Sequence, residues 1–175
     1  AGVTRTRVTR DGYGNLYLTV ATASGGITGT LGDLSTPLGA VDDAIQRSAA
    51  PLGITAHTVN ATPLPITVSY QAWVYTTSGL SETQVKQTVA KALQAMIAAT
   101  PIGGVKLVPA DATGFVFMEA LAAAIHNAVP EIFRVALVLP SSDLVLSATQ
   151  VPVLVHNPET QAVITQVSPP EGTIV

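Results

Sequence analysis

The amino-acid sequence predicts an α+β protein built from two small modules, each a sheet covered by helices. Three observations predict this class. Segments with apolar residues at every second position, typical of strands, occur in both halves of the chain. Segments with apolar residues at helical spacing lie between them. A proline-rich stretch at 61–65 separates the halves, giving the order β-β-α-β for residues 1–62, β-α-α-β-β-β for residues 63–168, and a tail over 169–175.

The first module opens with a predicted hairpin over residues 3–22. Its turn lies at 11–15, where Gly and Asn tolerate the positive φ angles of tight turns. The next element is a helix. Thr36 is its expected N-cap, and Pro37 takes the first helical position, where its missing N–H costs nothing. A strand over 54–60 completes the module.

The second module begins with a strand over 66–76 whose alternation predicts one buried face, formed by Ile66, Val68, Tyr70, Ala72 and Val74. A capping box at 81–84 then starts a long amphipathic helix. A third helix is predicted over 116–128 and ends before a proline. The remaining predicted strands are 133–139, 151–156 and 162–167.

The composition excludes several classes of function. Only 11% of residues are charged, against roughly 25% in typical soluble domains, so the surface is either neutral and polar or covered by a partner. The net charge is −3, and no basic stripe exists that could neutralise nucleic-acid phosphates. No apolar stretch approaches the roughly 20 residues of a membrane-spanning helix. The absence of cysteine excludes disulfides, thiol nucleophiles and cysteine-based zinc sites.

The titratable residues do not form a recognisable site. His57, His126 and His156 are not spaced as metal ligands, which favours three unrelated polar residues over a metal set. Asp42 and Asp43 are adjacent and therefore point about 100° apart on a helix. Their position, interpreted as early in the first helix, is explained by the helix dipole. We expect no catalytic residue, no metal site and no cofactor-binding site.

Four residues are candidates for a protein interface. Arg5 and Arg7 share one face of the first strand and could bind an acidic partner, although a solvated edge strand protected by charge is the commoner explanation. Trp73 and Tyr75 lie opposite the main apolar face of their strand. They form either an interface patch or a surface under a second layer, and the sequence favours neither.

An ordered series of short motifs runs through the chain. A helix ends in Val-Pro at 129–130, and a V-x-L-x-x-P strand at 135–140, an acidic turn and a V-P-V-L strand at 151–154 follow. Upstream, 61–68 reads ATPLPITV, and the long helix closes in a P-x-G at 101–103. This series resembles the C-terminal part of the baseplate J-like proteins of contractile phage tails and related injection machines. We interpret the chain as a fragment that lacks the family's N-terminal half.

The resemblance implies a structural role. Baseplate J-like proteins join neighbouring wedge proteins around the tail hub, so the implied location is the tail baseplate of a virion assembled in the host bacterial cytoplasm. The implied partners are other baseplate proteins, with a second copy of the chain as a further candidate and with no small-molecule substrate. It implies no catalysis. The alternatives are a binding module of a non-phage secretion or cell-surface machine and a small hydrolase, which would need titratable residues converging in a pocket.

Overall fold

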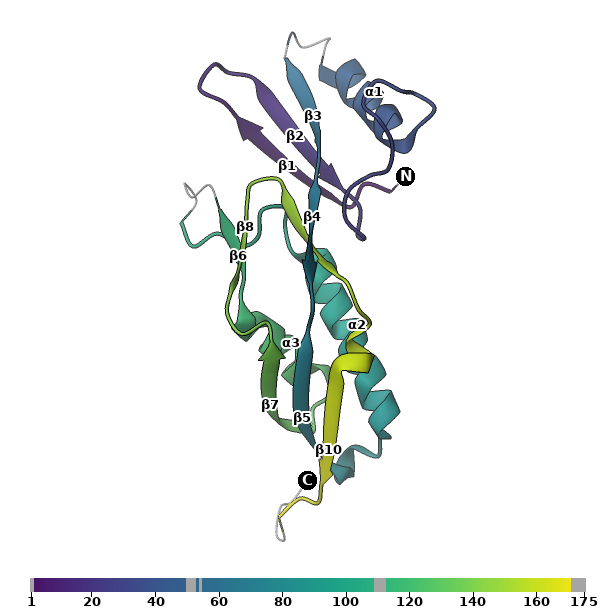
Figure 1. Ribbon diagram of the computed structural model, residues 1–175, viewed down its shortest axis with the longest axis vertical. Helices are drawn as coiled ribbons and strands as arrows, with labels where there is room; N and C mark the ends of the chain where they lie inside the picture. The colour runs from purple at the N-terminus through teal and green to yellow at the C-terminus, as the bar shows by residue number, and fades with distance from the viewer. Residues whose placement is uncertain (1, 50–52, 54, 109–112, 171–175) are drawn as a thin grey trace. The chain divides into compact units, whose positions relative to one another are not determined.

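The structure, a computed structural model, describes residues 2–49, 53, 55–108 and 113–170 and confirms the predicted α+β class (Figure 1). The described residues form two three-stranded sheets, in the orders β1-β2-β3 and β10-β5-β7, and two two-stranded sheets, β4-β9 and β6-β8. The elements are, in chain order, β1 (Arg5–Arg10), β2 (Leu16–Ala21), α1 (Pro37–Ala49), β3 (Ala56–Asn60), β4 (Thr62–Ile66), β5 (Ser69–Tyr75), the short 3-10 helix η2 (Thr76–Ser78), α2 (Glu82–Ala99), β6 (Gly114–Val116), α3 (Met118–Ala128), β7 (Ile132–Leu139), β8 (Leu144–Leu146), β9 (Gln150–Leu154), the 3-10 helix η3 (Pro158–Gln161) and β10 (Ala162–Val167).

The chain folds into two compact units, each assembled from three segments. Unit 1 comprises Ala1–Leu64, Thr100–Phe115 and Val145–Val153. Unit 2 comprises Pro65–Ala99, Val116–Leu144 and Leu154–Val175. The chain first crosses between units close to the predicted boundary at residue 62, but 100–115 and 145–153, expected in the second module, belong to unit 1. Residues 171–175 of the predicted tail lie outside the described residues.

A hairpin and a β-α-β crossover build the sheet of unit 1. β1 runs antiparallel to β2, as predicted, and β3 runs parallel to β2 after α1. The carboxylate of Asp11 orders the hairpin turn, because it accepts hydrogen bonds from the side chain of Asn15 and from the N–H groups of Tyr13 and Asn15. The Asn15 side chain contributes most to lowering the pKa of Asp11 from its ordinary value. α1 begins at Pro37, and the Thr36 hydroxyl caps it as expected.

The dipole explanation for Asp42 and Asp43 is wrong. α1 begins at Pro37, so neither carboxylate lies in its first turn. Asp42 instead accepts a 2.6 Å hydrogen bond from the hydroxyl of Thr58 on β3, and Asp43 pairs with Arg47 at 2.8 Å one turn later. Both side chains therefore have structural partners, one of them between the helix and the sheet.

The proline-rich stretch predicted as a joint at 61–65 contains the passage from unit 1 to unit 2, between Leu64 and Pro65. It is nevertheless a strand over most of its length, since β4 pairs with β9. The prediction rested on the missing proline N–H, which excludes proline from a central strand. A two-stranded sheet contains only edge strands, where proline is tolerated. Pro152 of β9 is accommodated in the same way.

In unit 2 the central strand is β5, which runs parallel to β10 and antiparallel to β7. The predicted apolar face is confirmed, because Ile66, Val68, Tyr70, Ala72 and Val74 are all buried. Helices α2 and α3 pack against each other, α2 contacts β10 and α3 contacts β7, behind the sheet in the view of Figure 1. Their buried side chains complete the core and are Val85, Val89, Ala90, Leu93, Ile97, Leu121 and Ile125.

The two helices of unit 2 begin at different kinds of cap. The predicted capping box starts α2: the Ser81 N–H donates to the Gln84 side chain at 2.9 Å, and the Gln84 N–H donates to the Ser81 hydroxyl at 3.3 Å. α3 begins two residues later than predicted, since 114–116 forms β6. The Met118 N–H at its start donates to the carboxylate of Asp143, 25 residues later in the chain, which local sequence reasoning did not find.

The buried hydroxyl of Tyr70 supplies a stability test. It has no hydrogen-bond partner among the described residues, and burial raises the pKa of Tyr70. An unpaired buried polar group costs its full desolvation, so we expect Tyr70→Phe to raise the free energy of unfolding by about 1 kcal/mol, measured by urea denaturation. Tyr75→Phe, on the partly exposed side of the same strand, should change it by less than about 0.5 kcal/mol. A destabilised Tyr70→Phe variant would contradict this account.

Candidate protein interface

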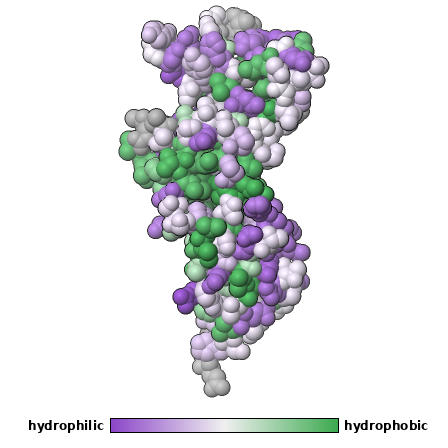
Figure 2. Space-filling view, in the orientation of Figure 1, coloured by the Kyte–Doolittle hydropathy of each residue, from purple (hydrophilic) through white to green (hydrophobic). Residues whose placement is uncertain are grey.

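The unit 2 sheet has one face that α2 and α3 do not cover. On β5 this face carries Gln71, Trp73 and Tyr75, which are half-buried or exposed and alternate with fully buried side chains. The strand register places Trp73 between Arg134 of β7 and Thr165 of β10. Figure 2 shows apolar surface interrupted by polar surface over these three strands. The face is therefore a mixed surface with aromatic side chains near its centre.

Two ring contacts order this face. The guanidinium carbon of Arg134 lies 4.6 Å from the centroid of the Trp73 ring, a cation–π geometry. The rings of Tyr75 and Phe133 stack with centroids 4.3 Å apart and planes inclined by 19°. Phe133 is still 40% exposed, and Val163 of β10, at 53% exposed, extends the apolar surface. We call these five residues the aromatic face.

The chemistry of the aromatic face is that of a protein interface. Tyr, Trp, Phe and Arg are enriched in the buried centres of interfaces, and Trp, Tyr and Arg dominate the residues whose loss weakens binding most. Because the rings already hold one another in place, docking costs them little further conformational entropy. Trp73 is the single tryptophan of the sequence, so its fluorescence reports on this surface alone.

The structure brings two of the four sequence-predicted interface residues together, Trp73 and Tyr75. Their partners Phe133 and Arg134 were not predicted. Strict alternation would put these two neighbours on opposite faces, but β7 has a register irregularity opposite the step from Trp73 to Val74. The irregularity lets Phe133 reach Tyr75 while Arg134 reaches Trp73, and no signal in the local sequence marks it.

For Arg5, both sequence-based explanations are wrong. The side chain is only 8% exposed, so it is neither free for an acidic partner nor a solvated edge charge. Its guanidinium donates to the carbonyl oxygens of Thr22 at 2.8 Å, Ala23 at 3.2 Å and Thr100 at 3.3 Å. Guanidinium has five N–H donors, so one arginine can satisfy several carbonyls and offset its own desolvation. Burial lowers the pKa of Arg5 from its ordinary value.

Arg7 holds a second pair of carbonyls on the same face of β1. Its Nη1 donates to the carbonyl oxygens of Ile102 at 3.2 Å and Ala148 at 3.0 Å. Gly103 favours this approach, because a Cβ there would collide with Nη1 of Arg7 and its φ of +77° lies in the left-handed region that favours glycine. Arg7 therefore has structural contacts through Nη1, while its side chain stays partly exposed, so the interface predicted for it stays a prediction.

The histidines do not gather into a site. His57 stacks on Tyr17 in unit 1, with ring centroids 5.1 Å apart, while the exposed His126 and His156 belong to unit 2. Within the part of the chain that the structure describes, no three His, Cys, Asp or Glu side chains are placed to hold a metal ion. Over the same residues, none of the helices has both the length and the apolar character needed to cross a membrane.

No protein-family model matches the sequence, and no curated protein matches it. The resemblance to baseplate J-like proteins is therefore carried by the motifs of the sequence. The function that it implies is a proposal.

The role of Arg5 gives a second stability test. Arg5→Met keeps the length and apolar stem of the side chain but removes the hydrogen bonds that the guanidinium donates to the three carbonyl oxygens. We expect the free energy of unfolding to fall by about 2–3 kcal/mol, measured by urea denaturation. The matched control is Arg10→Met on the same strand, where the side chain is exposed and a change below about 0.5 kcal/mol is expected. Equal small effects at both positions would refute the structural role.

Proposed function

We propose that this protein is a structural component of a phage-type contractile tail baseplate, a wedge protein that acts through protein–protein interfaces during baseplate assembly. The observation that carries the interface role is the aromatic face of unit 2. The baseplate assignment rests on the ordered motifs of the sequence, whose resemblance to the family runs over about residues 3–157 and includes the helical segment at 40–45. The motifs support the baseplate assignment, and the aromatic face supports the interface role.

The shape of the aromatic face favours a protein partner. A three-stranded sheet presents a broad surface, and sheets are stabilised by burying such faces against another layer of secondary structure. Here α2 and α3 supply that layer on one side only. A sheet or helix of a partner would complete the second side, and it would bury the Trp73 and Tyr75 rings together with Phe133.

Arg134 sets the charge that the partner must offer. Its guanidinium lies over Trp73 and is exposed in the isolated chain, so docking would remove it from water. An arginine buried at an interface needs a carboxylate or several carbonyl acceptors to offset its desolvation. The partner surface therefore combines apolar area with an acidic or carbonyl-rich position opposite Arg134.

This proposal includes the absence of catalysis. Asp42 holds α1 to β3 through Thr58, and His57 stacks on Tyr17, so both have structural contacts. Substituting Asp42, His57 or His126 should abolish no reaction. Substrate turnover that depended on one of these residues would favour the enzyme alternative.

The second candidate is a binding module of a non-phage secretion or cell-surface machine. The aromatic face would serve it equally well. Tail-sheath, tube and spike genes beside this one would favour the baseplate assignment, whereas genes of another envelope machine would favour the alternative.

The direct test is co-expression of the tagged full-length protein with its neighbouring genes, followed by affinity purification, mass spectrometry and particle sizing. We expect other tail proteins in stoichiometric amounts within a defined complex. The double variant Trp73→Ala, Tyr75→Ala should lower their recovery at least about tenfold, because truncating two central aromatic residues removes more than 1.4 kcal/mol of binding free energy.

The matched control is Tyr13→Ala. Tyr13 is an aromatic residue of the hairpin turn and is 96% exposed, so its loss should leave both folding and recovery unchanged. Circular dichroism of each variant separates a binding defect from unfolding. A wild-type protein that recovers no neighbour contradicts the wedge role, and full recovery by the folded double variant excludes the aromatic face as its interface.

A further inference from the structure

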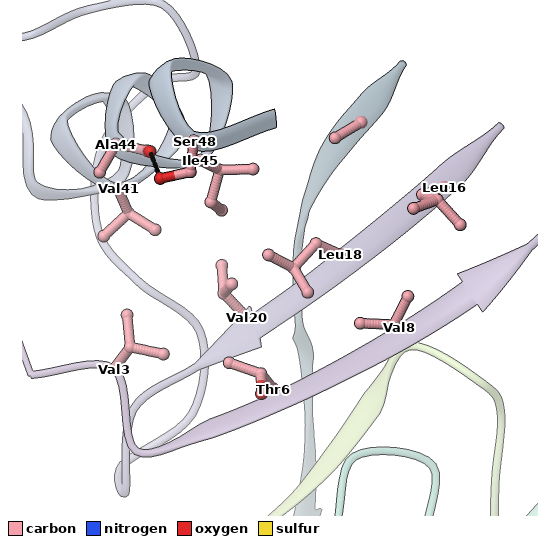
Figure 3. A pocket seen from close by; sticks show the side chains of 11 residues that line it. Val3, Thr6, Val8, Leu16, Leu18, Val20, Val41, Ala44, Ile45 and Ser48 are labelled. Atoms are coloured by element: carbon pink, nitrogen blue, oxygen red, sulfur yellow. Dashed lines mark hydrogen bonds between the residues drawn. The ribbon is translucent and has the colours of Figure 1, made fainter. Parts of the chain in front are cut away.

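Unit 1 contains an apolar groove of about 580 Å³ between α1 and the sheet (Figure 3). Val41 and Ile45 of α1 form one wall, and Val8, Leu16 and Leu18 of the sheet form the other. The groove exists because α1 packs against β3 and, through Leu38, against the Val20 end of β2, which leaves β1 uncovered on this sheet face. Its volume lies in the range of sites that hold ligands.

The strand beside this groove, β1, has a free edge. It is the terminal strand in the order β1-β2-β3, and no described strand pairs with its other side. At the hairpin turn the Asp11 N–H donates to the Asn15 carbonyl, and hydrogen-bonded pairs alternate with non-bonded pairs along an antiparallel ladder. Counting back from this pair, the residues whose backbone N–H and C=O groups point away from β2 are Thr6, Val8 and Arg10.

The free edge and the groove involve the same residues. Side chains alternate along a strand with the same period as the backbone groups. Thr6 and Val8 therefore direct their backbone groups to the free edge and their side chains to the groove, where Val8 is 60% exposed. A strand added to this edge would make backbone hydrogen bonds and cover apolar area at once.

The positive charge of β1 favours an acidic partner segment. The groove continues at Leu16 into a polar cavity of about 420 Å³ that Arg10 and Asn15 line. Among the described ion pairs none involves Arg7 or Arg10, so the cation at the end of the groove has no carboxylate partner in this part of the chain. A second copy of β1 offers Arg10 no carboxylate, because this strand contains three arginines and no acidic residue. An acidic partner segment is complementary instead.

We propose that β1 and the groove bind an extended segment of a partner protein by strand addition. The segment carries apolar side chains at alternate positions, which enter the groove, and a carboxylate on the same face opposite Arg10. This surface lies in unit 1, so the proposal does not depend on the aromatic face or on the baseplate assignment. A helix in the groove would cover the apolar wall but leave the backbone groups of the edge unpaired.

The test uses the 175-residue chain and a synthetic probe, the acetylated and amidated peptide Glu-Thr-Val-Thr-Val-Thr-Glu. The probe presents valines and glutamates on one face in either strand direction. Amide hydrogen exchange, resolved by residue with NMR, is measured with and without it. In the free chain the amides of Thr6, Val8 and Arg10 should exchange fast, and saturating peptide should slow them at least about tenfold.

Two control peptides separate the components of the proposal. Replacing both glutamates with lysine should weaken binding at least about fivefold, because the charge opposite Arg10 is reversed. Methylating the backbone nitrogens of the probe keeps its side chains but removes its donors, and should abolish the protection of Thr6 and Val8.

A matched pair of protein variants locates the site. Val8→Lys puts a charge into the groove and should abolish binding, whereas Val155→Lys, at a similarly exposed valine of unit 2, should leave it unchanged. Three outcomes overturn the proposal: no binding up to about 5 mM peptide, far weaker than a specific contact requires; binding without protection of the three edge amides; and protection that appears without peptide as the protein concentration rises, which would indicate a second copy.

Discussion

Two arginine side chains on β1 join the separate segments of unit 1. Arg5 and Arg7 donate to carbonyl oxygens as far as 95 and 141 positions away in the chain, which attaches residues near 100–102 and 148 to a sheet built from the first 60 residues. These hydrogen bonds also determine which side chains of β1 lie on the groove side of the sheet. Because side chains alternate along a strand, placing the two arginines on the inner face commits Thr6 and Val8 to the opposite face, where the groove lies.

Incomplete covering of the sheets explains both candidate surfaces. In unit 2 the two helices cover one face, and the rings of Trp73 and Tyr75 remain partly exposed on the other. In unit 1 a single helix covers part of one face and leaves the groove. The low fraction of charged residues, 11%, is consistent with surfaces that partner proteins cover, since charged residues are depleted at interface centres. An aromatic sheet face and a strand edge differ in chemistry, so each fits its own partner.

Local signals in the sequence predicted local structure well. The hairpin, the capping box at Ser81 and the buried face of β5 were found because each is determined by residues within a few positions of one another. Long-range contacts were not found. Alternation shows that Arg5 and Arg7 share a face, but it does not show which face of the strand is buried. Strand β4 could not be predicted from its own residues, because it forms only by pairing with the distant strand β9. Only part of the aromatic face could be predicted. Trp73 and Tyr75 follow from the alternation of β5, whereas the positions of Phe133 and Arg134 depend on a register irregularity of β7.

The central claim is that partners bury the aromatic face in the assembled state. The fluorescence of Trp73, the single tryptophan, reports on this face directly. Its quenching by acrylamide is compared between the isolated chain and the purified complex with neighbouring gene products. The partner proteins either contain no tryptophan or have each tryptophan replaced by phenylalanine. The account predicts ready quenching in the isolated chain, and in the complex a blue-shifted emission with a quenching constant reduced at least about threefold, as burial at an interface requires. Equal quenching in both states would contradict it.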